Sequence, residues 1–231
     1  MLFFDTIKLK VIKMKKNEIA KKILENIEPL FEEKIGQYEE LMAYFKCAMM
    51  EIETKFRVLN EEFSLQYDRN PISAIKSRLK TFKSIRDKLV KNDFPLSVAS
   101  VEENLNDVAG VRVICSFERD VYLLAEALLS QDDIELIAKK DYIANPKENG
   151  YRSLHLIVAV PIYLVNEKRT MRVEIQLRTI AMDSWATLEH QLRYKKNIDF
   201  TEEMAEELYL CSKLSAELDH KMDNLRKLVN V

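Results

Sequence analysis

Residues 171–178, MRVEIQLR, alternate strictly between apolar and polar side chains, which constrains the fold more than any other feature of the sequence. Successive side chains of a β-strand point to opposite faces of the sheet. The apolar row is Met171, Val173, Ile175 and Leu177. The polar row is Arg172, Glu174, Gln176 and Arg178. The first row predicts a core face, whereas the second is either solvated surface, the commoner case for an antiparallel strand, or the floor of a site for a charged ligand.

Hydrophobic periodicity along the rest of the chain predicts an α/β (α+β) fold in which helices flank a mixed sheet of about five strands. Strands are expected near residues 72–80, 111–117, 134–142, 153–164 and 170–178. Helices are expected at residues 81–91, 119–130, 179–195 and 202–229. Two further helices, expected within residues 17–62, would cap the domain.

Composition excludes several classes of protein. With 231 residues, of which 47% are hydrophobic, the chain can bury a core of its own. A net charge of -2 provides no global basic field for nucleic acid, so we expect no stable nucleic-acid partner and any basic site must be local. The cysteines Cys47, Cys115 and Cys211 are odd in number and far apart, which indicates packing residues in a reducing cytoplasm.

The sequence gives no sign of a membrane location. Residues 1–13 interrupt their apolar stretch with charged residues and lack a small-residue cleavage site, so we expect no signal peptide and interpret them as an upstream extension. The longest apolar run, Leu156 to Val165, contains Pro161 and is too short for a helix to cross a bilayer of about 30 Å. We therefore expect a cytoplasmic protein.

Glycine is scarce, with Gly36, Gly110 and Gly150 the three in the chain. Walker loops and dinucleotide fingerprints need several glycines so that backbone amides can approach phosphates, and both are excluded. Side chains must then hold any phosphate. Residues 71–91 offer basic side chains with Asp87 as their one acid. Taken alone, this stretch fits a solvated basic face as well as it fits a phosphate site.

Within that stretch, the expected strand and helix sort the side chains by face. The basic side chains on one strand face are Lys76, Arg78 and Lys80. On the helix that follows, Ser84 and Lys88 lie one turn apart. The same helix is expected to point Phe82, Ile85 and Leu89 toward the core.

Two further stretches add polar groups to the same sheet. In NDVAGVRVICSF, Asp107 precedes a buried strand, where α/β sheets commonly face a ligand crevice, and Arg112 points away from the core. In NPKENGYRSLHLIV, a turn presents Lys147 and Tyr151, and His155 follows on the outgoing strand. Tyr151 is either a core aromatic or a stacking platform. A lone histidine is more often structural, but the convergence of cations, carboxylates and an aromatic favours a functional site.

This combination favours phosphoryl transfer. Asp107 and Glu174 are able to share Mg²⁺, which prefers oxygen ligands and bridges polyphosphate oxygens. The neighbouring cations would neutralise charge on the transferred group. The sequence contains no Ser-His-Asp order, HExxH or CxxC motif to support a competing chemistry.

Four motifs, in order and with matching spacing, resemble those of the small alarmone synthetases of the RelA/SpoT type. The motifs are IKSRLKTFKSIRDKL, LNDVAGVRVICSF, KDYIANPKENGYRSLHLIV and VEIQLRTIAMDSWATLEH. Members of this family are GTP pyrophosphokinases that transfer the β,γ-pyrophosphate of ATP to the 3′-OH of GTP or GDP. The resemblance implies a nucleotidyltransferase-like synthetase fold and a homotetramer. It also implies one synthetase domain over 1–231, with N-terminal helices at 1–62, a catalytic core at 63–197 and a C-terminal helix at 198–231.

The resemblance also assigns roles to residues. The ATP-binding residues it implies are Arg78, Lys80, Ser84, Lys88, Arg112 and Lys140. The acceptor-binding residues it implies are Lys147, Tyr151, His155, Gln176 and Asp183. Asp107 and Glu174 would hold Mg²⁺, and Glu174 would also draw the proton from the acceptor 3′-OH or orient it. Arg112 would stack on adenine opposite Arg78, and Tyr151 on guanine.

Some positions depart from the family pattern or stay open. Lys140 stands where some relatives have arginine, which replaces a bidentate fork by a point charge. Asp183 stands where other members have asparagine, and its carboxylate would select guanine by accepting from N1–H and N2–H₂. Arg172 and Arg178 are either phosphate contacts or structural pairs. On the last core helix, the expected core residues are Trp185, Leu188 and Leu192.

Two other functions remain as alternatives. A toxin-like relative would pyrophosphorylate the 3′ end of tRNA with the same ATP half-site, and a non-catalytic nucleotide sensor would need no metal-binding carboxylates. Near-neutral charge weighs against the first, and Asp107 with Glu174 against the second. None of the three histidines is followed by aspartate, so we expect synthesis without hydrolysis. The preference between GDP and GTP stays open.

Overall fold

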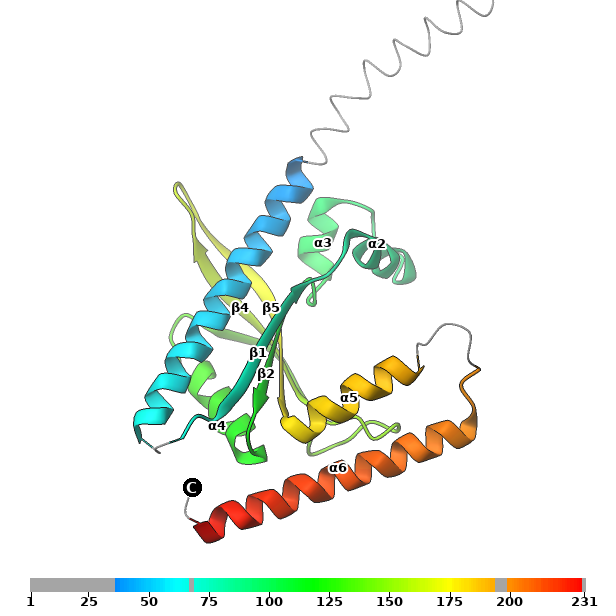
Figure 1. The fold of residues 1–231 in the computed structure, drawn as a ribbon. Helices are drawn as coiled ribbons and strands as arrows, with labels where there is room; N and C mark the ends of the chain where they lie inside the picture. The colour runs from blue at the N-terminus through cyan, green and yellow to red at the C-terminus, as the bar shows by residue number, and fades with distance from the viewer. Residues whose placement is uncertain (1–35, 67–68, 194–198, 230–231) are drawn as a thin grey trace, which may run out of the picture. The chain divides into compact units, whose positions relative to one another are not determined.

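A mixed five-stranded sheet lies at the centre of the computed structural model, which describes residues 36–66, 69–193 and 199–229 (Figure 1). The strands are β1 (Ile72–Leu79), β2 (Ala109–Cys115), β3 (Glu135–Asp141), β4 (Leu154–Tyr163) and β5 (Lys168–Thr179). The helices that follow β1 are α2 (Phe82–Lys91), α3 (Val98–Asn104), α4 (Glu118–Leu129), α5 (Ile180–Arg193) and α6 (Glu202–Val229). The strand order is β1-β2-β5-β4-β3, in which β2 and β5 are parallel and the other neighbours antiparallel.

By its internal contacts, the chain divides into residues 1–43 and residues 44–231. In the first unit, residues 36–43 are helical, and in the second unit residues 44–66 form one continuous helical stretch before β1. The extension expected at residues 1–13 and the first part of the helices expected within 17–62 lie outside the described residues.

The apolar row of β5 is buried, as predicted. Its four side chains are at most 1% exposed. Helix α4 contacts β2 and β5 on this face. Its fully buried contributions are Val121, Leu124 and Leu128. The helix over residues 44–66 adds Phe45, Ile52 and Phe56 to the core. Each such side chain stabilises the fold by about 1.5–3 kcal/mol relative to exposure.

The helix over residues 44–66 is tied to the sheet at two places. Asn60 accepts a hydrogen bond from the backbone N–H of Ile72 at 3.0 Å, at the start of β1. Near its middle, Lys55 donates to Asp133 in the connection between α4 and β3. One face of the sheet is therefore closed by helices, and the polar face of β5 lies on the other.

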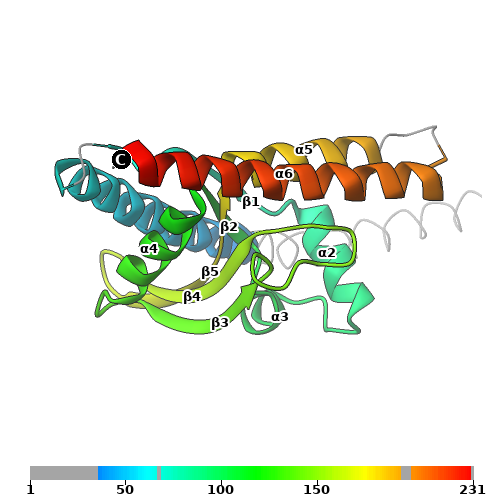
Figure 2. The ribbon, with the colours of Figure 1, turned by 90° about the horizontal axis from the view of Figure 1, so that it is seen from below.

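Helices α5 and α6 run side by side (Figure 2). Trp185 of α5 donates its indole N–H to the carbonyl of Leu208 at 2.8 Å. Asp219 of α6 accepts from Thr179 at 2.9 Å and from Arg152 at 3.1 Å, which fixes α6 to the end of β5. Burial raises the pKa of Asp219 despite these two partners.

Gly150 allows the loop before β4 to contact α6. Its φ of +85° lies in the left-handed region, where a side chain is strained. A Cβ at this position would also lie 1.9 Å from the hydroxyl of Ser212. Glycine is thus required both by the backbone and by the neighbouring helix.

The expected strands and core helices are confirmed, but three side chains were placed wrongly. Phe82 is 61% exposed because it is the first residue of α2, and Ile85 and Leu89 alone form that helix's buried face. Leu188 and Leu192 are 53% and 54% exposed. They lie in the second half of α5, which extends past the sheet beside α6 (Figure 1).

Helix α3 was not predicted. Its sequence, VASVEEN, buries only Ser100 and Val101, so it carries almost no hydrophobic periodicity. It begins with a cap, since the Ser97 hydroxyl accepts from the N–H of Ser100 at 3.1 Å.

Among the residues that the structure describes, no helix has the length and apolar character needed to cross a membrane. Of the cysteines, Cys115 is a buried packing residue as expected, whereas Cys47 is half-buried and Cys211 is exposed.

Candidate active site

One row of polar side chains crosses the open face of the sheet, with one residue from each strand. In the strand order, the row is Lys76, Arg112, Gln176, His155 and Lys140. Each residue is the direct partner of the next across a pair of strands, so neighbouring backbones lie about 4.8 Å apart. The polar face of MRVEIQLR is therefore the middle of a continuous polar surface.

A cavity of about 280 Å³ opens beside this row. In the adjacent row, Arg78, Gly110 and Glu174 are partners on β1, β2 and β5. Gly110 has no side chain, which leaves space between Arg78 and Glu174. Other residues that line the cavity are Lys76, Lys80, Asp107, Arg112 and Gln176.

Asp107 faces this cavity from the chain just before β2. Its Oδ2 accepts from Lys80 and lies 2.7 Å from the ammonium of Lys88. Burial acts to raise the pKa of this carboxyl, but the two lysines outweigh burial and hold the pKa below its ordinary value. Lys88 reaches Asp107 from α2, which Thr81 caps by accepting from the N–H of Ser84 at 3.3 Å.

The carboxylates fit a magnesium ion. Oδ1 of Asp107 is buried and finds no hydrogen-bond partner among the described residues, so it is oriented for a ligand that the protein does not itself supply. Glu174 lines the same cavity. Among the residues described, no group of three or more His, Cys, Asp or Glu side chains forms a complete metal cage. Two carboxylates suit Mg²⁺, which keeps positions for waters and substrate phosphates.

Glu174 is held at both carboxylate oxygens. His155 Nδ1 lies 3.5 Å from Oε1, and Gln176 donates to Oε2 at 3.1 Å. Burial acts to raise the pKa of Glu174, but the hydrogen bonds from His155 and Gln176 bring the pKa below its ordinary value. Glu174 is thus ionised at neutral pH and able to accept a proton.

An aromatic cluster lies beyond Glu174, on the side away from Asp107. The rings of Tyr142, Tyr151 and His155 meet edge to face with centroids 5.3–6.0 Å apart. The ammonium of Lys147 lies 4.6 Å from the ring centroid of Tyr142 and 4.9 Å from that of Tyr151. Tyr142 was missed from the sequence, although its place in KDYIANPKENGY, between two predicted site lysines, was a usable signal.

Arg178 and Asp183 form a buried ion pair at the base of the site. Arg178 is 4% exposed, and its NH1 lies 3.3 Å from Asp183 Oδ1. The same carboxylate accepts from Arg112 at 3.2 Å and from Lys76 at 3.1 Å. In contrast, Arg172 donates to the carbonyl of Glu103 at 2.8 Å, which ties β5 to α3.

The structure brings most of the predicted residues together, in two groups. Arg78, Lys80, Lys88 and Arg112 gather near Asp107, whereas Lys147, Tyr151 and His155 gather on the opposite side of Glu174. Two predicted ATP contacts are more remote. Ser84 is exposed on α2, and Lys140 is an exposed neighbour of His155, three strands from Arg112.

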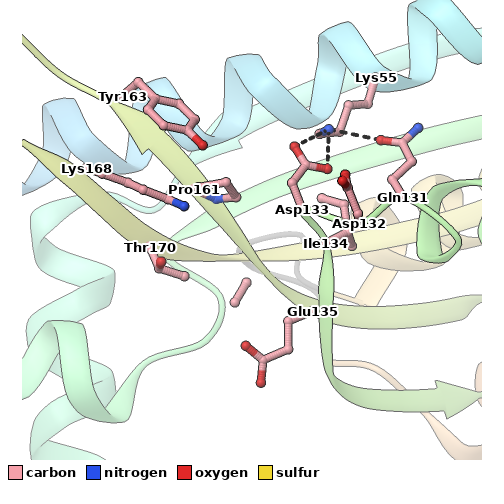
Figure 3. Close-up of a pocket in the computed structure, with 11 residues that line it drawn as sticks. Lys55, Gln131, Asp132, Asp133, Ile134, Glu135, Pro161, Tyr163, Lys168 and Thr170 are labelled. Carbon is pink, nitrogen blue, oxygen red and sulfur yellow. Dashed lines mark hydrogen bonds and ion pairs between the residues drawn. The ribbon is translucent and has the colours of Figure 1, made fainter.

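A larger hollow of about 800 Å³ lies at the other end of β4 and β5 (Figure 3). The half-buried charge of Lys55 is neutralised there, because Lys55 donates to Gln131 at 2.9 Å and to Asp133 at 2.6 Å. No residue that the sequence predicts for the site lines this hollow.

Comparison with known proteins agrees with this geometry. A family model described as "Region found in RelA / SpoT proteins" matches residues 77–199. The GTP pyrophosphokinase YwaC of Bacillus subtilis is 42% identical over 191 residues, which cover 83% of this chain and 90% of YwaC.

Two crystal structures of small alarmone synthetase 1 from Bacillus subtilis are similar in fold. The structure bound to its product pppGpp has a TM-score of 0.76 and 34% identity, and covers 84% of this chain and 98% of that one. The structure bound to AMPCPP has a TM-score of 0.71 and 31% identity, with the same coverage. The chain belongs to the RelA/SpoT family, and within that family it is similar to the small alarmone synthetases.

Proposed function

We propose that the protein is a GTP pyrophosphokinase that makes the alarmone (p)ppGpp, by transferring the β,γ-pyrophosphate of ATP to the 3′-OH of GTP or GDP. The observation that carries this proposal is the placement of Glu174, which lies between a basic cavity at Asp107 and the aromatic cluster at Tyr151. A donor nucleotide and an acceptor nucleotide therefore have separate places on either side of one ionised carboxylate. The activity named for YwaC supports the same assignment.

The donor nucleotide binds over β1, β2 and α2. Arg78, Lys80 and Lys88 neutralise its phosphates, and electrostatic neutralisation with positioning is the main catalytic contribution in phosphoryl transfer. Arg112 stacks on adenine opposite Arg78. Ser84 and Lys140 complete the phosphate contacts, with Lys140 reaching the pyrophosphate from the acceptor side. AMPCPP, an ATP analogue, is the ligand named for the related synthetase 1 structure.

Asp107 and Glu174 would hold Mg²⁺. When bound, Mg²⁺ supplies neutralisation of the phosphate oxygens and a template for the in-line displacement. Lys80 and Lys88 share Oδ2 of Asp107 in the structure, so they hold this carboxylate in its ionised form for the metal.

The transfer needs one proton to move. The acceptor 3′ oxygen attacks the β-phosphorus of ATP, and a bond forms between these two atoms. The bond from the β-phosphorus to the oxygen that bridges the α and β positions breaks, and AMP leaves with that oxygen. The 3′-OH proton passes to Glu174, which is ionised at neutral pH and so has an oxygen able to accept it. The product is pppGpp from GTP or ppGpp from GDP.

The acceptor binds over β4 and its preceding loop. Tyr151 stacks on guanine once Lys147 leaves its ring face for the acceptor phosphates, which His155 also contacts. Gln176 orients the acceptor beside Glu174. Asp183 accepts from guanine N1–H and N2–H₂, in competition with Lys76 for Oδ2. This contact would select guanine over adenine, whose N1 is itself an acceptor.

We propose further that residues 63–197 are the catalytic core of one synthetase domain, with helices before and after it, and that the protein works in the cytoplasm as a homotetramer. Apolar side chains on α6 recur every three or four residues and are 46–65% exposed, which supports assembly through this helix. They are Leu210, Leu214, Leu218, Met222 and Leu225. A monomer mass in light scattering at working concentration would contradict the tetramer.

The test is a product assay. Purified protein is incubated with Mg²⁺ and ATP, together with GDP, GTP, deacylated tRNA or no acceptor, and the products are separated by anion exchange. We expect AMP and a more highly charged guanosine nucleotide, both lost in Glu174→Gln. Glu167→Gln is the matched control, since Glu167 is an exposed glutamate in the turn before β5. Transfer only to tRNA would select the toxin alternative, and no AMP under any condition would contradict the enzyme.

A further inference from the structure

Two hydrogen-bonded connections run from the buried guanidinium of Arg178 to the two carboxylate oxygens of Glu174. In the first, Arg178 NH2 lies 2.5 Å from the Tyr151 hydroxyl, which lies 2.8 Å from His155 Nε2, and His155 Nδ1 is 3.5 Å from Glu174 Oε1. In the second, Arg178 NH2 donates to Gln176 Oε1 at 3.0 Å, and Gln176 Nε2 donates to Glu174 Oε2 at 3.1 Å.

The chemistry of the two ends fixes the direction of both connections. Arginine can only donate hydrogen bonds, and an ionised carboxylate can only accept them. The Tyr151 oxygen therefore accepts from Arg178, which leaves its one proton for donation to His155 Nε2. In that arrangement Nε2 accepts, and the imidazole proton sits on Nδ1 and faces Glu174. The Gln176 amide is oriented in the same way, with its oxygen toward Arg178 and its nitrogen toward Glu174.

We propose that Arg178 is a positioning residue for Glu174, and that it acts through the Tyr151 hydroxyl and the Gln176 amide. This inference rests on the proposed function, in which Glu174 takes the proton of the acceptor hydroxyl. The first connection selects the Nδ1–H tautomer of His155. At metal-binding histidines, removing the group that fixes the tautomer typically costs about 10–100-fold in metal affinity or activity, which sets the scale expected here. The 3.5 Å contact between His155 and Glu174 is long, as contacts in substrate-free active sites often are.

The rest of the site explains why Arg178 can serve both connections. Its NH1 is held by Asp183 at 3.3 Å and its Nε by the Ser153 hydroxyl at 3.4 Å, which leaves NH2 for Tyr151 and Gln176. Burial lowers the pKa of Arg178, but an arginine stays charged in any accessible pH range. Arg178 is thus a permanent hydrogen-bond donor, held in place by Asp183 and Ser153. In this arrangement Asp183 Oδ1 holds Arg178 in position. This role is separate from the proposed contact between Asp183 Oδ2 and the acceptor.

The decisive variant is Tyr151→Phe, which keeps the ring for guanine and removes the hydroxyl. The protein contains three histidines, so ¹⁵N spectra of the imidazole groups are simple to assign, with His155→Gln identifying the signals of His155. In the nucleotide-free enzyme at pH 8, we expect the Nδ1–H tautomer for His155. In Tyr151→Phe, we expect the Nε2–H tautomer to appear, a kcat about tenfold lower, and an acceptor KM within about twofold of the original.

Two further variants separate the connections from general effects. Gln176→Met cuts only the second connection, so we expect a fall in kcat of about tenfold while His155 keeps its Nδ1–H tautomer. Tyr163→Phe makes the same chemical change as Tyr151→Phe at the other end of β4, where Tyr163 is 72% exposed, and should change neither measurement.

The outcomes are distinguishable from failure of the proposed function. An Nε2–H tautomer or an imidazolium at His155 in an active wild-type enzyme would overturn the arrangement while leaving the synthetase assignment intact. A Tyr151→Phe variant that raises the acceptor KM with kcat unchanged would also overturn it, because the hydroxyl would then serve binding alone. Absence of AMP from the wild-type enzyme would instead overturn the proposed function on which the inference rests.

Discussion

Gly110 lies directly opposite Glu174 across the parallel strands β2 and β5, so the position between that carboxylate and Arg78 of β1 carries no side chain. The cavity beside the polar row depends on this glycine. Its backbone does not require glycine, because an added Cβ would meet only the Arg78 carbonyl at 3.8 Å, an ordinary contact.

We therefore predict that Gly110→Val folds normally but loses activity. Its isopropyl group would project into the cavity between Arg78 and Glu174, where the transferred phosphates are proposed to bind. AMP release should fall at least about tenfold, while the β-branched side chain suits a strand and keeps the midpoint of thermal unfolding within a few degrees. The activity of Gly110→Ala should lie between that of the wild type and that of Gly110→Val. If Gly110→Val lost thermal stability along with its activity, the loss of activity would not show that the side chain fills the cavity, and the prediction would be contradicted.

Gly150→Ala should destabilise the protein instead. The left-handed backbone and the overlap with Ser212 both oppose a Cβ, and together they should lower the free energy of unfolding by about 1–3 kcal/mol, measured in urea. Gly36→Ala is the matched control, because Gly36 is helical with open space around it and alanine there should stabilise slightly. A Gly150→Ala variant as stable as the wild type would show that the contact with α6 is not maintained in solution.

Asp107 should contribute stability that disappears in acid. The pKa of its carboxyl lies below 3.8 in the folded protein, since Lys80 and Lys88 outweigh burial, so the unfolded chain takes up the proton first as the pH falls. The stability gap between the wild type and Asp107→Asn should be full at pH 7 and should close as the pH falls through about 4 toward the folded pKa. Urea unfolding at a series of pH values measures the gap. Asp87→Asn, at an exposed aspartate, is the matched control variant.

Removing the Asp183 carboxylate should be costly because it leaves a buried cation uncompensated. Asp183→Ala deprives Arg178 of its partner in an environment only 4% exposed, and breaking a buried pair in this way typically costs about 3–5 kcal/mol. Asp183→Asn, which keeps an acceptor oxygen, should cost less. Glu217→Ala removes an exposed ion pair with Lys221 and should change the free energy of unfolding by less than about 1 kcal/mol. If Asp183→Ala and Glu217→Ala lowered the free energy of unfolding by similar amounts, the buried ion pair would not have the predicted effect on stability.

The sequence predicted what depends on neighbours along the chain. The two faces of MRVEIQLR follow from the period of a strand, and the apolar face is buried as expected. The predicted burial of Phe82 and Leu188 was wrong, because burial depends on which element lies opposite in space, and the local sequence does not show this. Helix α3 escaped notice because its capping serine, rather than an apolar stripe, defines it.

For the site, too, the sequence predicted features that depend on local motifs but not those that depend on neighbours in space. Asp107 and Glu174, which recognisable motifs carry, line one cavity, while their roles stay predictions. The connections from Arg178 were not visible, since they depend on the register between β4 and β5 and on the path of the preceding loop. A side chain whose role is to hold another carries no local pattern that distinguishes it from an ordinary structural arginine.

The polar row across the sheet takes one residue from every strand, and a slip of one residue in any pairing would turn that strand's contribution to the opposite face. The substrate surface therefore exists only when all four pairings are in register. A partly folded chain, in which some strands are unpaired or out of register, does not form this surface even in part. Enzymatic activity in such a protein therefore requires the whole sheet to be formed. A misfolded copy is expected to be inactive rather than active without regulation.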